Sequence, residues 1–298
     1  MITHCWRERL EAQELVAIDH MLALAADFDE EAGFSTATPA VPGHGGDVHH
    51  LLVRMPPKGE RESPDLDALP DAEVVGYLRL EVADGTGSVQ LVIRPEFRSL
   101  GVATLLFERL DSESDGWASI PGLRVLRAWS HGAHPAADRM CRRFDARLEH
   151  ALFKTLRQIG GSRPFDGDPL PTVERIGNAE VPELMPDHDL TMAPAEKAAL
   201  KLASSTITDA SGARTILGAH PEQPASTAAV LALVHEVGTP VAALKGLLTQ
   251  GLLDLQECGA RTAQLYVDAL DDAFVSASRE LEFIHDQSDL LYARELPV

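Results

Sequence analysis

The stretch VIRPEFRSLGVATLLFERL, from Val92 to Leu110, determines how the rest of the chain is interpreted. Its apolar strand ends at Arg94, and after Gly101 the apolar residues recur at helical spacing. The first amides of a helix have no partner inside it, and with the helix dipole they form a site for a diphosphate. Glycine at 101 and alanine at 103 keep that approach open, because larger side chains would hold phosphates away from the backbone. Taken alone, the pattern also fits a plain strand-to-helix turn with an incidental arginine.

The charge of the chain argues against a polyanionic partner. Among 298 residues there are 46 acidic and 26 basic ones, which gives a net charge of −20. Such a field repels nucleic acid and anionic membrane surfaces. An anionic ligand must therefore be held by a local site, where Arg98 supplies positive charge. The hydrophobic content of 45% is enough to fill two cores in a chain of this length.

The cysteines and the apolar runs indicate the cellular setting. Cys5, Cys141 and Cys258 are scattered, which fits reduced thiols, and none stands at the spacing of a metal site. The first residues lack a basic segment followed by an apolar run and a cleavage site, and no later run reaches the ~18 apolar residues of a membrane span. We expect a cytoplasmic, monomeric protein that uses no metal, nucleic acid or membrane.

Hydrophobic periodicity predicts the order of elements around the opening stretch. A helix is expected within residues 7–27, a strand at 50–55, and a hairpin in EVVGYLRLEVADGTGSVQLVIRP. After the helix at 100–110 come a strand at 123–130, a helix at 134–148 and a strand at 151–159. His131 and His134 could form a metal pair or a base, but the neighbouring Gly132 and Pro135 favour an ordinary strand end and helix start.

The second part of the chain partly repeats the first. VGTPVAALKGLLTQGLLDL echoes the opening stretch, and RTAQLYVDALDDAFVSASRELEF echoes the strand and helix that follow it. This pattern predicts two duplicated domains at 1–159 and 172–298, joined by a glycine- and proline-rich linker at 160–171. Only 16 residues separate HPEQ from Pro240, so we expect the central meander of the second copy to be missing.

Several stretches resemble a known family. The opening stretch is similar to motif A of the GNAT acetyltransferases, whose Arg/Gln-x-x-Gly-x-Gly/Ala loop holds the pyrophosphate of acetyl-CoA. WSHGAHPAA, GAHPEQPAS and QLYVDALDDAFVSASRELEF resemble stretches of the mycothiol synthase family, tandem GNAT proteins that acetylate the cysteinyl amine of desacetylmycothiol (Cys-GlcN-Ins). The resemblance covers most of the chain and is strongest at 72–140 and 214–296.

This resemblance implies both a fold and an activity. The fold is α+β, with two GNAT-like domains, each a mixed and mostly antiparallel sheet with helices on both faces, the second domain being shortened. The activity is transfer of acetyl from acetyl-CoA to the small-molecule substrate desacetylmycothiol. An acetyl-CoA-binding pseudoenzyme and a general small-amine N-acetyltransferase remain as alternatives.

The resemblance also implies site residues in both copies. In the first copy, acetyl-CoA would contact Leu91, Val92, Ile93, Ser99, Leu100, Gly101, Val102, Ala103 and Thr104. In the second copy, it would contact Val237, Gly238, Thr239, Asp271, Asp272, Ala273, Phe274, Val275 and Ser276. The substrate would contact Thr36, Glu222, Glu236 and Tyr266. Glu236 and Glu222 would be the candidates for the general base, since a glutamate can accept a proton through water if burial raises its pKa.

The second copy departs from the family pattern. Its motif A would contain Lys245 and Gly246 but no second small residue at the proper distance. Ser278 stands where family members place a tyrosine that protonates the departing thiolate, Glu282 replaces a glycine, and Leu233 aligns with a lysine. These losses are what keeps the pseudoenzyme alternative open.

Overall fold

The computed structural model describes residues 2–32, 47–55, 73–170, 174–176, 205–208, 214–218, 228–236 and 238–297. The chain divides into two compact units. Unit 1 comprises Met1–Glu149 and Leu291–Val298, and unit 2 comprises His150–Leu290. The chain enters unit 2 within strand β6 (Arg147–Gln158) and returns to unit 1 within strand β12 (Ile284–Glu295). The predicted domain ranges differ from these units in the placement of β6 and of the residues after 290.

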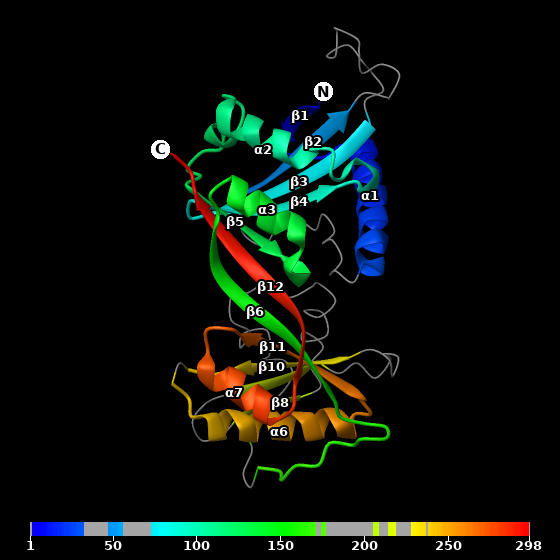
Figure 1. Ribbon diagram of the computed structural model, residues 1–298, viewed down its shortest axis with the longest axis vertical. Helices are drawn as coiled ribbons and strands as arrows, with labels where there is room; N and C mark the ends of the chain where they lie inside the picture. Colours follow the sequence, from blue (N-terminus) through cyan, green and yellow to red (C-terminus); the bar gives the residue numbers. More distant parts are fainter. Residues whose placement is uncertain are drawn as a thin grey trace. The chain divides into compact units, whose positions relative to one another are not determined.

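Unit 1 is a mixed sheet with the strand order β1-β2-β3-β4-β5 (Figure 1). Its strands are β1 (Thr3–Arg7), β2 (Asp47–Met55), β3 (Glu73–Ala83), β4 (Thr86–Ile93) and β5 (Val125–Ser130). Its helices are α1 (Ala12–Glu31), α2 (Val102–Ser112) and α3 (Pro135–Arg143), with short 3₁₀ turns at Pro95–Phe97, Trp117–Ser119 and His131–Ala133. Only β4 and β5 run parallel among the strand pairs described for this unit.

The predicted hairpin is confirmed at β3 and β4. Asp84 and Gly85 in the turn have φ values of 51° and 80°, the left-handed backbone that two-residue hairpin turns require. The predicted first helix is α1, whereas β1 before it was not expected, because a five-residue strand with no alternating pattern gives little signal.

Helices cover both faces of the sheet of unit 1, as the alternation of buried residues along the strands requires. Leu51 and Val53 of β2 belong to the core that includes Leu106 of α2. Leu52, which lies between them, packs instead with Ile18 of α1. Successive residues of one strand therefore feed two separate cores, and this fixes α1 and α2 on opposite faces.

Unit 2 repeats the same plan. Its strand order is β6-β11-β10-β9-β8-β7, with β10 and β11 parallel and the other described pairs antiparallel. The elements are β7 (Glu174–Ile176), β8 (Ser205–Thr208), β9 (Arg214–Gly218), β10 (Ala229–Val234), α6 (Val241–Glu257), β11 (Thr262–Asp268) and α7 (Asp272–Glu280). Leu247, Leu248 and Leu252 of α6 are fully buried, and each such side chain contributes about 1.5–3 kcal/mol.

The expectation that the second copy lacks its central meander is wrong. Strands β8, β9 and β10 form an antiparallel meander ahead of α6, as β2, β3 and β4 do ahead of α2. The error came from counting strands only after HPEQ, whereas β8 and β9 end before it, at Thr208 and Gly218. These strands are short, with 4, 5 and 6 residues, against 9, 11 and 8 in unit 1, so the second domain is shortened in strand length.

None of the helices in the described part of the chain is both long and apolar enough to span a membrane.

Candidate functional site

The parallel strands β4 and β5 of unit 1 separate part-way along their length. Within the described range 73–170, they are paired from Thr86 to Ser88 of β4, although β4 continues to Ile93 and β5 to Ser130. On its other side, β4 stays paired with β3 as far as Ile93. The backbone of residues 89 to 93, which includes the predicted Leu91, Val92 and Ile93, therefore lines an opening between two parallel strands. Backbone groups there can bond an extended ligand.

The turn from β4 into α2 holds the predicted phosphate residues. Ser99 and Gly101 have φ values of 62° and 80°, and Gly101 is the N-cap residue of α2. The first bond inside the helix runs from the Leu105 amide to the Gly101 carbonyl, at 2.9 Å. The amides of residues 102 to 104 precede this first donor, so they are available at the helix start. A Cβ added at Gly101 would meet no described atom within 4 Å, so the described residues leave space beside Gly101 at the start of the helix.

Arg98 links this turn to the end of β4 and to α1 through hydrogen bonds. Its Nε donates to the Ile93 carbonyl at 2.9 Å, and its two terminal nitrogens bond the carboxylate of Asp29 at the end of α1. The guanidinium also lies 5.3 Å from the ring centroid of Phe28. The expectation that Arg98 supplies local positive charge for an anion is therefore wrong, because the carboxylate of Asp29 neutralises that charge. The backbone amides and the dipole of α2 remain as the attraction for an anion.

His134, at the start of α3, is influenced by the charges of Arg98 and Asp29 beside the turn from β4 into α2. His134 is the N-cap residue of α3, and its Nδ1 accepts a bond from the Ala136 amide at 3.1 Å, which confirms the predicted helix start. Burial lowers the pKa of His134; the negative charge of Asp29 acts in the opposite direction, while Arg98 and Arg139 lower the pKa further. His134 thus shares its electrostatic surroundings with the Arg98–Asp29 pair.

Unit 2 carries a second opening of the same kind. Strands β10 and β11 are paired from Ala229 to Leu231 of β10, although β10 continues to Val234. Gly238 in the following turn has a φ of 91° and, like Gly101, has no described atom within 4 Å of an added Cβ. Thr239 closes the turn, since its amide and its hydroxyl both donate to the Glu236 carbonyl, at 3.1 and 2.8 Å.

The expected second motif A around Lys245 and Gly246 is misplaced. Both residues lie inside α6, which begins at Val241. The Lys245 ammonium bonds Glu280 of α7 at 2.9 Å, and a Cβ at Gly246 would come within 2.9 Å of Leu170. Gly246 therefore serves helix packing, and the glycine of the turn is Gly238.

His235, which the sequence did not single out, joins the two elements that flank the opening in unit 2. Its Nε2 lies 3.2 Å from Oδ2 of Asp271, and its Nδ1 lies 3.1 Å from the Glu236 carbonyl. Asp271 in turn caps α7 by accepting from the Phe274 amide at 2.9 Å. The predicted segment Asp271, Asp272, Ala273, Phe274, Val275 and Ser276 is thus the first turn of α7 with its cap. A histidine after a strand and an aspartate before a helix are common, so only the tertiary pairing identifies this contact.

The predicted base and the predicted substrate contact of the second copy differ in their exposure to solvent. Glu236 is exposed and follows β10, so the expectation that it is buried is wrong, and any role as a base would be played through water. Tyr266 is 9% exposed on β11, where it stands opposite Lys154 of β6. Thr36, Glu222 and Val237 lie outside the described residues.

A cavity of about 260 Å³ lies in unit 2 between α7 and the strands β6 and β12. Ser278 of α7 lines it together with Thr155 and His285. The hydroxyl of Ser278 donates to the Val275 carbonyl at 2.8 Å, and that of Thr155 donates to the Leu265 carbonyl at 2.9 Å. The cavity therefore occupies the position where a larger side chain at 278 would project.

Comparison with curated proteins identifies the family, although no model of a protein family matches the chain. A mycothiol acetyltransferase of Streptomyces coelicolor is 30% identical over 257 residues, which cover 76% of this chain and 78% of that relative. The chain belongs to the mycothiol acetyltransferase family. A Nocardia farcinica member of this family is 28% identical over 329 residues, and the match covers 98% of both chains. The match with a Parafrankia member, at 29% identity, spans 57% of this chain but only 47% of that relative.

Solved structures agree with the fold. A tandem GNAT protein from the clavulanic acid biosynthesis pathway has a TM-score of 0.60 at 15% identity, and the match covers 100% of this chain and 99% of that one. A GCN5-related N-acetyltransferase from Sphaerobacter thermophilus has a TM-score of 0.55 at 15% identity, with 99% and 96% covered. The predicted α+β fold of two GNAT-like domains is confirmed.

Proposed function

We propose that this member of the mycothiol acetyltransferase family transfers the acetyl group of acetyl-CoA to the cysteinyl amine of desacetylmycothiol and so forms mycothiol. The observation that carries the proposal is the pairing of two features in unit 1. An opening between the parallel strands β4 and β5 lies directly beside a glycine turn at the start of α2. An extended chain with a diphosphate at one end fits both features at once.

The residues at this turn fit acetyl-CoA by their backbone chemistry. The amides of Val102, Ala103 and Thr104 precede the first helical donor, and a diphosphate at the helix start would receive charge-assisted hydrogen bonds from them. The backbone of Leu91 to Ile93 would bond the pantetheine arm as a further strand would. Acetyl-CoA would supply an activated thioester there, and the net charge of −20 makes this local set of amides essential for binding.

The transfer itself needs one proton acceptor and one proton donor. The amine nitrogen of the substrate attacks the thioester carbonyl, a C–N bond forms, the C–S bond breaks, and the thiolate takes up a proton. Glu236 is the proposed acceptor for the proton of the substrate ammonium in unit 2, where acetyl-CoA would enter the second opening, between β10 and β11, and Glu236 would act through water from the turn after β10. Glu222, Tyr266 and Thr36 are the proposed substrate contacts. These three assignments rest on the family resemblance.

A binding protein without turnover is the second candidate. Two observations in unit 2 favour it: Glu236 is exposed, and the cavity beside α7 is lined by Ser278 instead of a larger phenol. A charge in water is a weaker base for a bound ammonium than a buried one, and serine has no acidity suited to a thiolate leaving group. In this case the protein would bind acetyl-CoA without turnover and act as a sensor of acetyl-CoA or as a scaffold.

One assay separates these functions. Purified protein is incubated with acetyl-CoA and Cys-GlcN-Ins, and the N-acetylated product is measured by mass spectrometry against a reaction without protein. We expect product above the uncatalysed rate. Calorimetric binding of acetyl-CoA without any product would favour the binding protein, and acetylation of cysteine and glucosamine as fast as Cys-GlcN-Ins would favour a general amine acetyltransferase. Absence of both binding and product would refute the proposal.

A further inference from the structure

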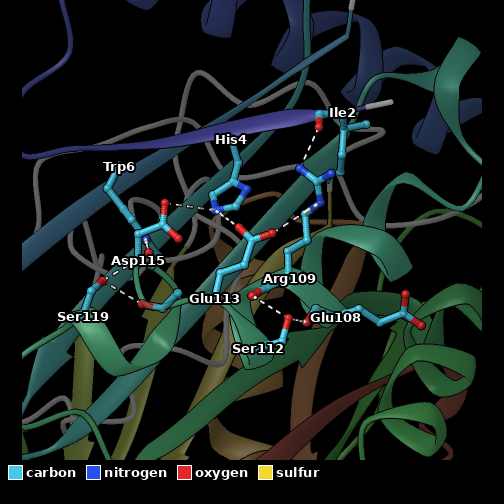
Figure 2. Close-up of polar contacts among 10 residues, drawn as sticks. Ile2, His4, Trp6, Glu108, Arg109, Ser112, Glu113, Asp115 and Ser119 are labelled. Carbon is cyan, nitrogen blue, oxygen red and sulfur yellow. Dashed lines mark hydrogen bonds and ion pairs between the residues drawn. The ribbon is translucent and has the colours of Figure 1, made fainter. Parts of the chain in front are cut away.

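Three side chains of unit 1 converge at the end of α2 that lies away from the glycine turn (Figure 2). His4 extends from β1, Glu113 is the C-cap residue of α2, and Asp115 follows in the next turn. His4 Nε2 lies 3.7 Å from Oε2 of Glu113 and 3.9 Å from Oδ2 of Asp115. The three potential ligand atoms, one from each residue, all lie within 4.8 Å of one another.

The imidazole at the centre of this cluster has an unsatisfied nitrogen. The His4 side chain is only 3% exposed, and its Nε2 is buried without a hydrogen-bond partner among the described residues. Buried polar atoms almost always have a partner, so an orphaned nitrogen aimed at two carboxylates calls for an explanation. At 3.7 and 3.9 Å the two carboxylate oxygens are too distant to be that partner.

We propose that His4, Glu113 and Asp115 bind a divalent first-row metal ion of the zinc class. One imidazole nitrogen and two carboxylate oxygens are ligands that zinc accepts, and three protein ligands with a water complete a tetrahedral site. Zinc bonds of about 2.0–2.2 Å place tetrahedral ligand atoms roughly 3.4 Å apart. The observed separations of 3.7 and 3.9 Å exceed this by a few tenths of an ångström, which rotation of the two carboxylate side chains can close. The nitrogen ligand disfavours Mg²⁺ and Ca²⁺, which prefer all-oxygen sites.

The surrounding residues position the two carboxylate ligands. The second oxygen of Glu113 lies 3.7 Å from Nε of Arg109, and Arg109 also donates to the Ile2 carbonyl at 2.8 Å. The Asp115 carbonyl accepts from Trp6 Nε1 at 2.8 Å and from the Ser119 hydroxyl at 3.2 Å (Figure 2). These contacts use the backbone of Asp115 and leave its carboxylate, which is 67% exposed, for the metal.

The position of the cluster indicates what the metal would do. It lies at the C-terminal end of α2, where the helix dipole is negative and favours a cation. The acetyl-CoA turn is at the other end of that helix, an 11-residue helix about 17 Å long. The metal would therefore take no part in acetyl transfer. It would fasten β1, the edge strand of the sheet in unit 1, to the end of α2.

The test uses the full-length protein, stripped with EDTA and dialysed. Calorimetric titration with ZnCl₂ should reveal one strong site per chain, and saturating zinc should raise Tm by roughly 5 °C or more. His4→Gln and Asp115→Asn should each weaken zinc binding at least tenfold. Asp115→Asn alters only an exposed carboxylate, so it keeps the test valid should His4→Gln fail to fold. His20→Gln, an exposed histidine on α1, is the matched control and should bind zinc as the wild type does.

Two further measurements distinguish the site from a generally acidic surface. CoCl₂ should produce intense visible d–d absorption in the wild type and His20→Gln but not in His4→Gln, because intense bands require tetrahedral Co²⁺ bound by the protein, whereas octahedral aqueous Co²⁺ absorbs only weakly. MgCl₂ should give no comparable heat. The proposal is overturned by a wild type without stoichiometric zinc binding, by His4→Gln and Asp115→Asn variants that bind zinc like the wild type, or by equally strong binding of Mg²⁺.

Discussion

Replacing Gly101 by leucine should strongly weaken acetyl-CoA binding in unit 1 at a small cost in stability. Gly101 has a φ of 80°, a conformation that costs an L-residue about 1–2 kcal/mol. No described atom lies within 4 Å of the new Cβ, so no steric clash adds to that cost. The side chain would instead project into the space beside Gly101, where the diphosphate is proposed to bind. Losing two amide–phosphate bonds of about 1.5–3 kcal/mol each raises Kd roughly 100-fold or more.

The chain offers a matched control for the strain. Gly122 also lies in unit 1, has a φ of 74° and has open space around its Cβ, but it is remote in sequence from the turn. Gly122→Leu should lower the free energy of unfolding by a similar 1–2 kcal/mol while acetyl-CoA binding stays unchanged. Calorimetry gives the affinity and stoichiometry, and urea denaturation gives the stability. If Gly101→Leu bound acetyl-CoA as tightly as Gly122→Leu, the assignment of this turn as the diphosphate site would be refuted.

An equivalent pair of glycine-to-leucine substitutions can be made in unit 2. Gly238 and Gly259 have φ values of 91° and 87°, and a Cβ at either meets no described atom within 4 Å. A drop in stoichiometry for Gly238→Leu but not for Gly259→Leu would mean that the second turn also binds acetyl-CoA. The four variants together therefore assign binding to one copy, to the other, or to both.

Three other substitutions test the roles of single side chains. Glu236→Gln should lower turnover by about 10²–10⁴-fold with little change in the affinity for acetyl-CoA, measured by steady-state kinetics and calorimetry. Arg98→Met should lower the free energy of unfolding by about 1–3 kcal/mol, because its ion pair with Asp29 is 24% and 15% exposed and so lies between surface and buried pairs. His134→Asn should flatten the pH dependence of stability between pH 5.5 and 7.5, measured by urea denaturation at each pH.

The sign of the His134 effect follows from its lowered pKa. Because the folded state binds this proton less readily than the unfolded state, stability is lost as the pH falls through the unfolded pKa of about 6.5. Protonation also removes the Nδ1 acceptor of the Ala136 amide, which asparagine can replace as a cap. Burial lowers the pKa of His50 as well, so some pH dependence remains in the variant. A steeper profile in His134→Asn would contradict this account.

Controls for the other two substitutions use exposed residues. Glu257→Gln alters an exposed glutamate at the end of α6, and turnover should not change. Arg142 is 79% exposed in its pair with Asp138, so Arg142→Met should change stability by less than about 1 kcal/mol. Arg98→Met in an Asp29→Asn background should cost less than in the wild type, since the partner charge is already gone. Equal turnover for Glu236→Gln and wild type would remove Glu236 from the mechanism.

Much of the fold could be predicted because its determinants are local. The alternation of apolar residues in 73–95 and the turn at Asp84 and Gly85 specify the hairpin without reference to other parts of the chain. The glycine at 101 marks the start of α2 for the same reason, since its left-handed backbone conformation favours glycine. The repeat likewise indicated a second domain. The wrong alignment of Lys245 and Gly246 shows the limit of this approach, because a lysine and a glycine also occur inside helices.

The contacts of the site could not be predicted in the same way. Arg98 meets Asp29 of α1, and His235 meets Asp271 at the start of α7, through the docking of helices on sheets. His4 reaches Glu113 only because β1 pairs with β2 at the edge of the sheet and lies next to the end of α2. The sequence by itself determined the elements, the duplication and the glycine turns, since these depend on residues close together in the chain. The tertiary structure alone decided which charges are neutralised and that Nε2 of His4 is left without a hydrogen-bond partner among the described residues. Those outcomes depend on distances between residues that are far apart in the sequence.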